Sequence, residues 1–233
     1  MKLFTLILCA LSLNTYAQFS SEDTATVNIT GGNTDLKTYA LKSVNAYKWT
    51  KHSLGLNGLY NYGESDKERS AENWNLGLRY DFIFSDKVSL YFGELLEADR
   101  FAGVKRRYNT DLGAKYTFIN TDKTKLFAEL GYRYTIEEST DTTAADRKDS
   151  KGRAYLETSR VFKKDLTGKF WVEYLPNFSN SDDFLINLEP SIIVALSSTF
   201  SMKSAYLWKY DNSPNAGNGK HDYNYTLSLI ANF

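Results

Sequence analysis

Hydrophobic and polar residues alternate along most of the chain, from Asp23 to Phe233. In the last segment every second residue from Tyr223 to Phe233 is apolar, and the residues between them are polar except Ile230. Residues 73–84 and 108–118 follow the same rule. Successive side chains of a β-strand point to opposite faces, so this pattern predicts strands with one apolar and one polar face. No segment shows a sustained helical period.

About twelve such segments can be counted, with ten as the alternative. The second segment is blurred around Lys42 and Asn45, the fifth contains Glu94 and Glu97, and the eighth is also weakly defined. The predicted strands lie near residues 23–31, 36–49, 52–62, 72–84, 87–97, 106–118, 124–136, 152–162, 168–175, 184–197, 200–210 and 222–233.

The connections between these segments fall into two length classes. Short links lie at 50–51, 85–86, 120–123, 163–167 and 198–199, and longer polar loops lie at 63–71, 98–105, 137–151, 176–183 and 211–221. The first link, 32–35, is short for its position. Short turns at one end and long loops at the other are typical of outer-membrane barrels, so we expect an all-β fold, a closed antiparallel up-and-down barrel.

Aromatic residues gather near the two ends of the predicted strands. Strand propensity accounts for the number of these residues but not for their placement, whereas two girdles at the membrane interfaces account for both. The candidate girdle residues are Tyr62, Trp74, Tyr80, Phe84, Tyr108, Phe118, Tyr134, Trp208, Tyr210, Tyr223 and Tyr225.

Pro190 is the one residue that resists this scheme. It lies inside the tenth segment on its apolar side and has no N–H to donate to a sheet. We therefore expect either a bulge at Pro190 or a strand that begins after it.

The first 17 residues have the pattern of a cleaved signal peptide. Lys2 precedes an apolar run from Leu3 to Leu13, and small residues at Thr15 and Ala17 predict cleavage before Gln18. The single cysteine, Cys9, lies within this segment. The mature domain, 18–233, would then contain neither a disulfide nor a thiol nucleophile.

The composition of the chain argues against several classes of protein. The chain has 28 basic and 28 acidic residues, so it has no net positive field for nucleic acid. Its mean hydropathy of -0.45 argues against a bundle of transmembrane helices. The balanced charge and the low mean hydropathy alone are typical of a soluble protein. Residues sorted by the two faces of the predicted strands, however, form an apolar belt and a charged interior.

Three stretches of the chain resemble a bacterial family of salt-induced outer membrane proteins. They are the opening strand leading to Gly32, Asn33 and Thr34, the stretch from Asn73 through Asp81 to Phe101, and the strand from Asp111 to Tyr116. The resemblance covers most of the mature chain and implies an outer-membrane barrel connected with salt or envelope stress. It implies no substrate and no functional residues. The C-terminal Phe233 also resembles the signal that the outer-membrane assembly machinery reads.

The polar face carries charged residues that would point into the barrel lumen. They could line a channel for small solutes, or they could pair with one another and fill the lumen, and twelve strands lie between plugged and open barrels. The candidate lumen residues are Arg79, Asp81, Arg107, Asp111, Lys115, Glu129, Arg133, Lys169, Glu173, Lys203 and Lys209.

No catalytic constellation is recognisable. The two histidines, His52 and His221, fall at opposite ends of the predicted barrel, which argues against the serine–histidine pair of a lipase-like barrel enzyme. We expect no metal site and no cofactor. The prediction is a non-enzymatic outer-membrane barrel in a lipid bilayer, structural or a narrow channel. A soluble periplasmic barrel that binds an apolar ligand inside is the alternative from another class.

Overall fold

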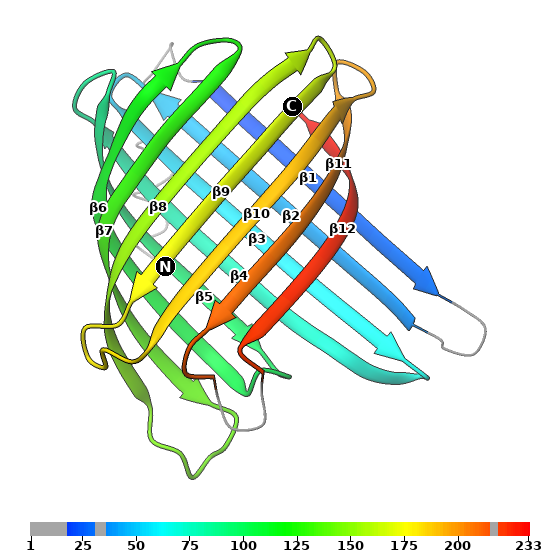
Figure 1. Ribbon diagram of the computed structural model, residues 1–233, viewed down its shortest axis with the longest axis vertical. Coiled ribbons are helices and arrows are strands. Elements are labelled where there is room, and N and C mark those ends of the chain that lie inside the picture. The colour runs from blue at the N-terminus through cyan, green and yellow to red at the C-terminus, as the bar shows by residue number, and fades with distance from the viewer. Residues whose placement is uncertain (1–17, 31–35, 215–218) are drawn as a thin grey trace, which may run out of the picture.

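The protein is a single closed β-barrel of twelve antiparallel strands (Figure 1). The computed structural model describes residues 18–30, 36–214 and 219–233. The predicted signal peptide, 1–17, and the predicted link at 32–35 lie outside the described residues. The strands are β1 (Gln18–Thr30), β2 (Leu36–Trp49), β3 (His52–Ser65), β4 (Glu68–Ile83), β5 (Val88–Asp99), β6 (Val104–Asn120), β7 (Thr124–Ser139), β8 (Arg147–Lys163), β9 (Leu166–Pro176), β10 (Phe184–Ala195), β11 (Phe200–Asp211) and β12 (His221–Asn232).

Each strand pairs with its two neighbours in the chain, and β1 pairs with β12 to close the ring. The predicted fold class and the count of twelve strands are therefore confirmed. Strands about 4.8 Å apart and tilted by about 40° give twelve strands a backbone diameter of about 24 Å. No helix long and apolar enough to cross a membrane occurs in the described part of the chain.

The two ends of the barrel differ less in loop length than the sequence predicted. The expected loop at 63–71 is a two-residue turn, because β3 and β4 continue to Ser65 and from Glu68. Asp66 and Lys67 both have left-handed backbones, with φ of 53° and 67°. Two consecutive residues of this kind are what a type I′ hairpin requires. Asp66–Lys67 lacks the glycine that usually marks such a turn, so the sequence signal was missed.

The expected irregularity at Pro190 was wrong. β10 runs unbroken from Phe184 to Ala195, and its register with β9 stays constant through Pro190. On the other side β10 and β11 keep one register, but they form no pair at Glu189 or Pro190. The strand therefore tolerates the missing N–H by giving up local pairing with β11 alone.

The seam between β1 and β12 is short. The two strands pair from Glu22 and Asn232 to Ala25 and Leu229, and backbone bonds of 2.9 and 3.0 Å join Ser21 to Phe233. A hydrogen bond of 2.6 Å between the Thr26 and Ser228 hydroxyls follows. Beyond it β1 and β12 diverge towards the long-loop end, at the bottom of Figure 1. The barrel is closed most firmly where β1 begins and β12 ends.

Two of the three weakly defined segments of the sequence pattern, the fifth and the second, obey the alternation. In β5, Glu97 faces inward and binds Arg107, whereas the exposed Glu94 faces outward and accepts a hydrogen bond from Thr110. In β2, Asn45 faces outward and donates to Ser43, and Lys42 faces inward. The blur in the sequence came from polar residues on the outward face, which hydrogen-bond to one another.

Candidate functional site: the barrel lumen

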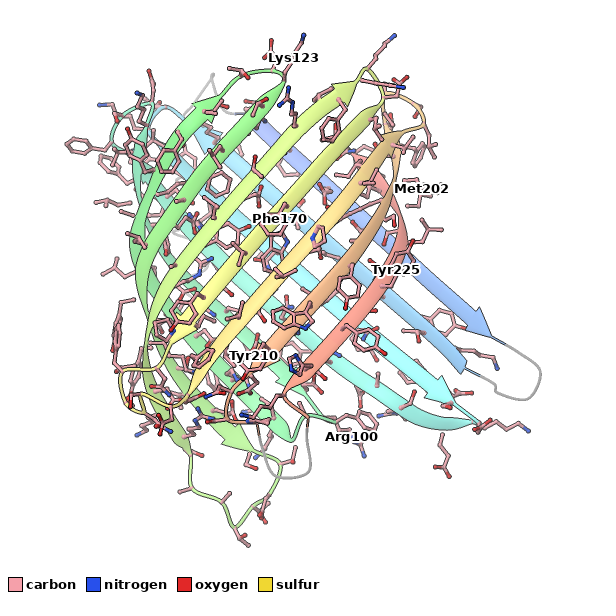
Figure 2. The ribbon with its side chains drawn as sticks, in the orientation of Figure 1. Arg100, Lys123, Phe170, Met202, Tyr210 and Tyr225 are labelled. Atoms are coloured by element: carbon pink, nitrogen blue, oxygen red, sulfur yellow. The ribbon has the colours of Figure 1, made fainter. Side chains whose placement is uncertain are left out.

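The outward face of the barrel is an apolar belt. Leucines and aromatic residues there are exposed, including Leu130 and Phe84, each at 70%, and Tyr223 at 74%. Figure 2 shows the Met202 and Tyr225 side chains projecting away from the barrel, with Lys123 and Arg100 at its two ends. Of the eleven aromatic residues predicted as girdles, ten lie on strand positions of this outward face, and the exposed Phe84 directly follows the end of β4.

The inner face holds a network of ion pairs centred on Glu129 of β7. The Glu129 side chain is 3% exposed and binds Arg79 of β4 at 2.8 Å and Arg153 of β8 at 2.6 Å. Arg79 also holds Asp81 at 2.8 Å. Because β5 and β6 lie between β4 and β7 in the sheet, the Arg79–Glu129 contact crosses the inner face over these two strands.

The network continues towards the long-loop end through Glu173. This carboxylate accepts from Arg153 at 2.6 Å and lies 3.9 Å from Arg133, which binds Asp111 at 2.7 Å. Separate pairs join Arg107 to Glu97 and Glu137. Buried carboxylates without such partners would be expensive, so these pairs satisfy charges that the lumen encloses.

Two glycines make room for the aromatic centre of this network. Tyr91 of β5 is 2% exposed, and the Arg79 guanidinium lies 4.1 Å from its ring centre. A Cβ at Gly113 would lie 2.6 Å from Tyr91, and one at Gly131 would lie 2.5 Å from its hydroxyl. The ring therefore lies flat across β6 and β7, where its hydroxyl accepts from Arg153 at 3.1 Å.

Most predicted lumen residues take part in these contacts. Lys169 binds Glu157 at 3.0 Å and Lys203 binds Glu189 at 2.7 Å, while the Lys115 ammonium lies 3.7 Å from the Phe127 ring centre. Lys209 shares the inward side of β11 with Lys203 but has no ion pair within the described part of the chain. The structure thus brings Arg79, Asp81, Asp111, Glu129, Arg133 and Glu173 into one network and leaves Lys115, Lys169, Lys203, Lys209 and Arg107 outside it.

Sequence reasoning missed Arg153 and Tyr91, which connect the network. Both lay in segments that were predicted as strands, and Arg153 alternates correctly with Ala154 and Leu156. The alternation could therefore have placed Arg153 inside. Tyr91 could not be found in this way, because its neighbours Leu90 and Phe92 are also apolar and the polar face cannot be told from the apolar face there.

The wall formed by β1 and β2 is different from the wall that carries the network. Glu22, Lys42 and Lys48 lie on the inward side of these strands, yet all three are exposed. An exposed side chain on an inward face shows that the lumen beside it is open to water. The network therefore fills the lumen on one side and leaves space on the other.

The histidines offer no catalytic pair. His52 Nδ1 is 2.6 Å from the Tyr80 hydroxyl, and the His221 ring lies against Trp208 and Tyr210. They begin strands β3 and β12, at opposite ends of the barrel. Within the described residues no three His, Cys, Asp or Glu side chains form a group that could hold a metal ion.

Comparison with protein families assigns the chain to one of them. Residues 24–233 match the family described as "Protein of unknown function, DUF481", and the protein belongs to this family. No curated protein matches the chain.

Solved structures share the fold at low sequence identity. An outer membrane channel, COG4313 from Pseudomonas putida F1, aligns with a TM-score of 0.57 and 12% identity over 95% of this chain and 97% of that chain. A NanC porin aligns with a TM-score of 0.52 and 11% identity over 92% of this chain and 98% of that one. These similarities show that the chain has the fold of outer-membrane barrels.

Proposed function

We propose that the protein spans the bacterial outer membrane and provides a narrow aqueous passage for small polar solutes. The observation that carries the location is the apolar outward belt around an ion-paired interior. Such a belt in water would leave many large hydrophobic side chains exposed, whereas in lipid it is the stable arrangement. A closed barrel also leaves few unpaired backbone groups in hydrocarbon.

The same observation disfavours the alternative of a soluble barrel that binds an apolar ligand. That protein would place its aromatic face inside and its charges outside. Here the lumen contains Glu129, Arg79 and Arg153, and the leucines point outward. A lipase-like activity also lacks support, since neither histidine is hydrogen-bonded to a serine among the described residues.

The open space beside the network supports passage over a purely structural role. Glu22, Lys42 and Lys48 are exposed on the inner face of β1 and β2. We propose that solutes cross along this wall, past the ion-paired side. The network then acts as a rigid partition that narrows the lumen.

Further parts of the proposal concern export and assembly. Residues 1–17 would be removed as a signal peptide, and Phe233 would present the C-terminal strand to the barrel-assembly machinery. A connection with salt or envelope stress, implied by the family resemblance, stays a prediction.

Reconstitution into planar bilayers tests the passage. We expect discrete conductance steps, and we expect Lys42→Glu to move the reversal potential in a KCl gradient towards cation selectivity, because it reverses a charge on the passage wall. Glu94→Gln, on the outward face of β5, is the matched control and leaves the reversal potential unchanged. A membrane that stays sealed at high protein load refutes the channel.

A further inference from the structure

A pocket lies in the lumen close to the short-turn end. Its volume is about 480 Å³, within the range of about 300–1,000 Å³ typical of small-molecule sites. The wall is continuous from β2 to β8. In register order, the paired lining residues are Lys48–Ser53, Ser53–Asp81, Ile83–Ser89, Ser89–Lys115, Lys115–Glu129 and Glu129–Tyr155. Arg79 and Arg153 complete the pocket.

The charges that line this pocket do not balance. Four cations, Lys48, Arg79, Lys115 and Arg153, face two carboxylates in the lining, Asp81 and Glu129, and Arg153 is also paired with Glu173 just outside it. Both carboxylates are already held by the two arginines at 2.6–2.8 Å. They are therefore poor partners for a further cation.

The two lysines have no carboxylate partner of their own within the described part of the chain. Lys48 makes no ion pair there and is exposed to the lumen. Lys115 is held by a ring instead, with its ammonium 3.7 Å from the centre of Phe127. A cation–π contact positions an ammonium without using up its N–H donors as a carboxylate would.

We propose that this pocket binds a small oxyanion, a phosphate or a carboxylate group, that enters from the short-turn end. Lys48 and Lys115 supply charge-assisted hydrogen bonds, and the hydroxyls of Ser53 and Ser89 lie in the same wall. The ion-paired network beneath, Arg79–Glu129–Arg153, forms the floor of the pocket, and the positive charge that is free to meet an anion comes from the two lysines. In an outer-membrane barrel the short turns face the periplasm. Anions from the periplasm would therefore enter this pocket.

The proposal deepens the proposed function, since it names the solute class held beside the passage, but its test does not require a pore. Isothermal titration of the refolded, detergent-solubilised barrel with inorganic phosphate, at constant ionic strength against chloride, should show saturable binding. A parallel titration with succinate distinguishes phosphate from carboxylate as the preferred group. We expect the double variant Lys48→Met, Lys115→Met to bind at least about tenfold more weakly.

Lys209→Met is the matched control. It removes a lumen-facing lysine from β11, outside the pocket, and should change the affinity less than twofold. Heat-modifiable migration on gels shows that each variant is folded. The proposal is overturned if neither anion binds the wild-type barrel, or if the double variant binds as tightly as the wild type.

The outcomes for the two proposals are separable. A barrel that conducts in bilayers but binds neither anion loses the oxyanion site and keeps the passage. A barrel that binds phosphate through the two lysines but leaves bilayers sealed loses the passage and keeps the site.

Discussion

At the residue scale, Glu129 holds the lumen network together. Its 3% exposed carboxylate bridges Arg79 and Arg153. Replacing it with alanine breaks two buried ion pairs and leaves Arg79 with Asp81 and Arg153 with Glu173. Breaking a buried pair by removing one partner typically costs about 3–5 kcal/mol. We expect Glu129→Ala to lower the free energy of unfolding by about that amount in guanidinium titrations of the barrel in lipid vesicles.

The control for this prediction is Glu72→Ala on the rim. Glu72 pairs with Arg69, whose side chain is 42% exposed. An exposed pair contributes about 0–1 kcal/mol, so the two variants should differ clearly. Equal losses would mean that Glu129 is as hydrated as a surface residue and that the network does not enclose it.

Gly113 shows why a glycine is needed on the inner face of β6. A Cβ there would lie 2.5 Å from the Leu130 carbonyl oxygen and 2.6 Å from the Tyr91 ring. Overpacking of this kind costs about 1–3 kcal/mol, so Gly113→Ala should reduce the free energy of unfolding by that amount. Gly93→Ala, on the inner face of the adjacent strand with its nearest atom at 3.6 Å, should cost less than about 0.5 kcal/mol.

At the element scale, the seam depends on the end of β12. Backbone bonds between Ser21 and Phe233 extend a ladder that otherwise covers only Glu22 to Ala25 on β1. Deleting Phe233 removes those bonds, whereas Phe233→Ala removes only the ring. In refolding from urea into detergent, without assembly machinery, we expect the deletion to lower the temperature at which the compact gel band is lost, and Phe233→Ala to leave it nearly unchanged.

The same two variants, the deletion of Phe233 and Phe233→Ala, distinguish a role of Phe233 in barrel closure from a role in recognition by the assembly machinery. In cells the assembly machinery would read the aromatic ring, so Phe233→Ala should there reduce the amount of folded barrel in the outer membrane. If both variants refold and assemble like the wild type, neither the seam nor the assembly signal depends on Phe233.

The strands, and the face on which each side chain lies, could be predicted from the sequence because a period of two is a local signal. The up-and-down strand order followed from the lengths of the connections. Asp111 and Arg133 could be placed on the inner face by counting from their neighbours. Local patterns could not predict which inward charged residues form ion pairs with one another. The Arg79–Glu129 contact joins residues from strands β4 and β7, and it depends on barrel diameter and tilt. The Asp66–Lys67 turn was missed because its conformation lacks the usual glycine.

At the scale of the whole molecule, the placement of apolar residues outside and charged residues inside determines whether lipid or water stabilises the barrel. Most of the charged residues inside pair with one another, and the outward belt gains nothing from water. Leu130 lies in this belt on β7, and its side chain is 70% exposed. It stands between the aromatic residues Tyr116 and Phe118 towards the short-turn end and Tyr132 and Tyr134 towards the other. A substitution at Leu130 therefore tests directly whether the outward belt contacts lipid.

Leu130→Arg should separate a membrane barrel from a soluble one. An arginine on the lipid face near the bilayer midplane costs about 2–4 kcal/mol and close to the interface about 0–1 kcal/mol, whereas an exposed surface substitution in water usually changes stability by less than about 0.5 kcal/mol. We expect the larger cost for Leu130→Arg in lipid vesicles. Phe118→Arg, placed nearer the rim, should cost less. If both variants unfold like the wild type, the belt does not contact hydrocarbon and the membrane location is wrong.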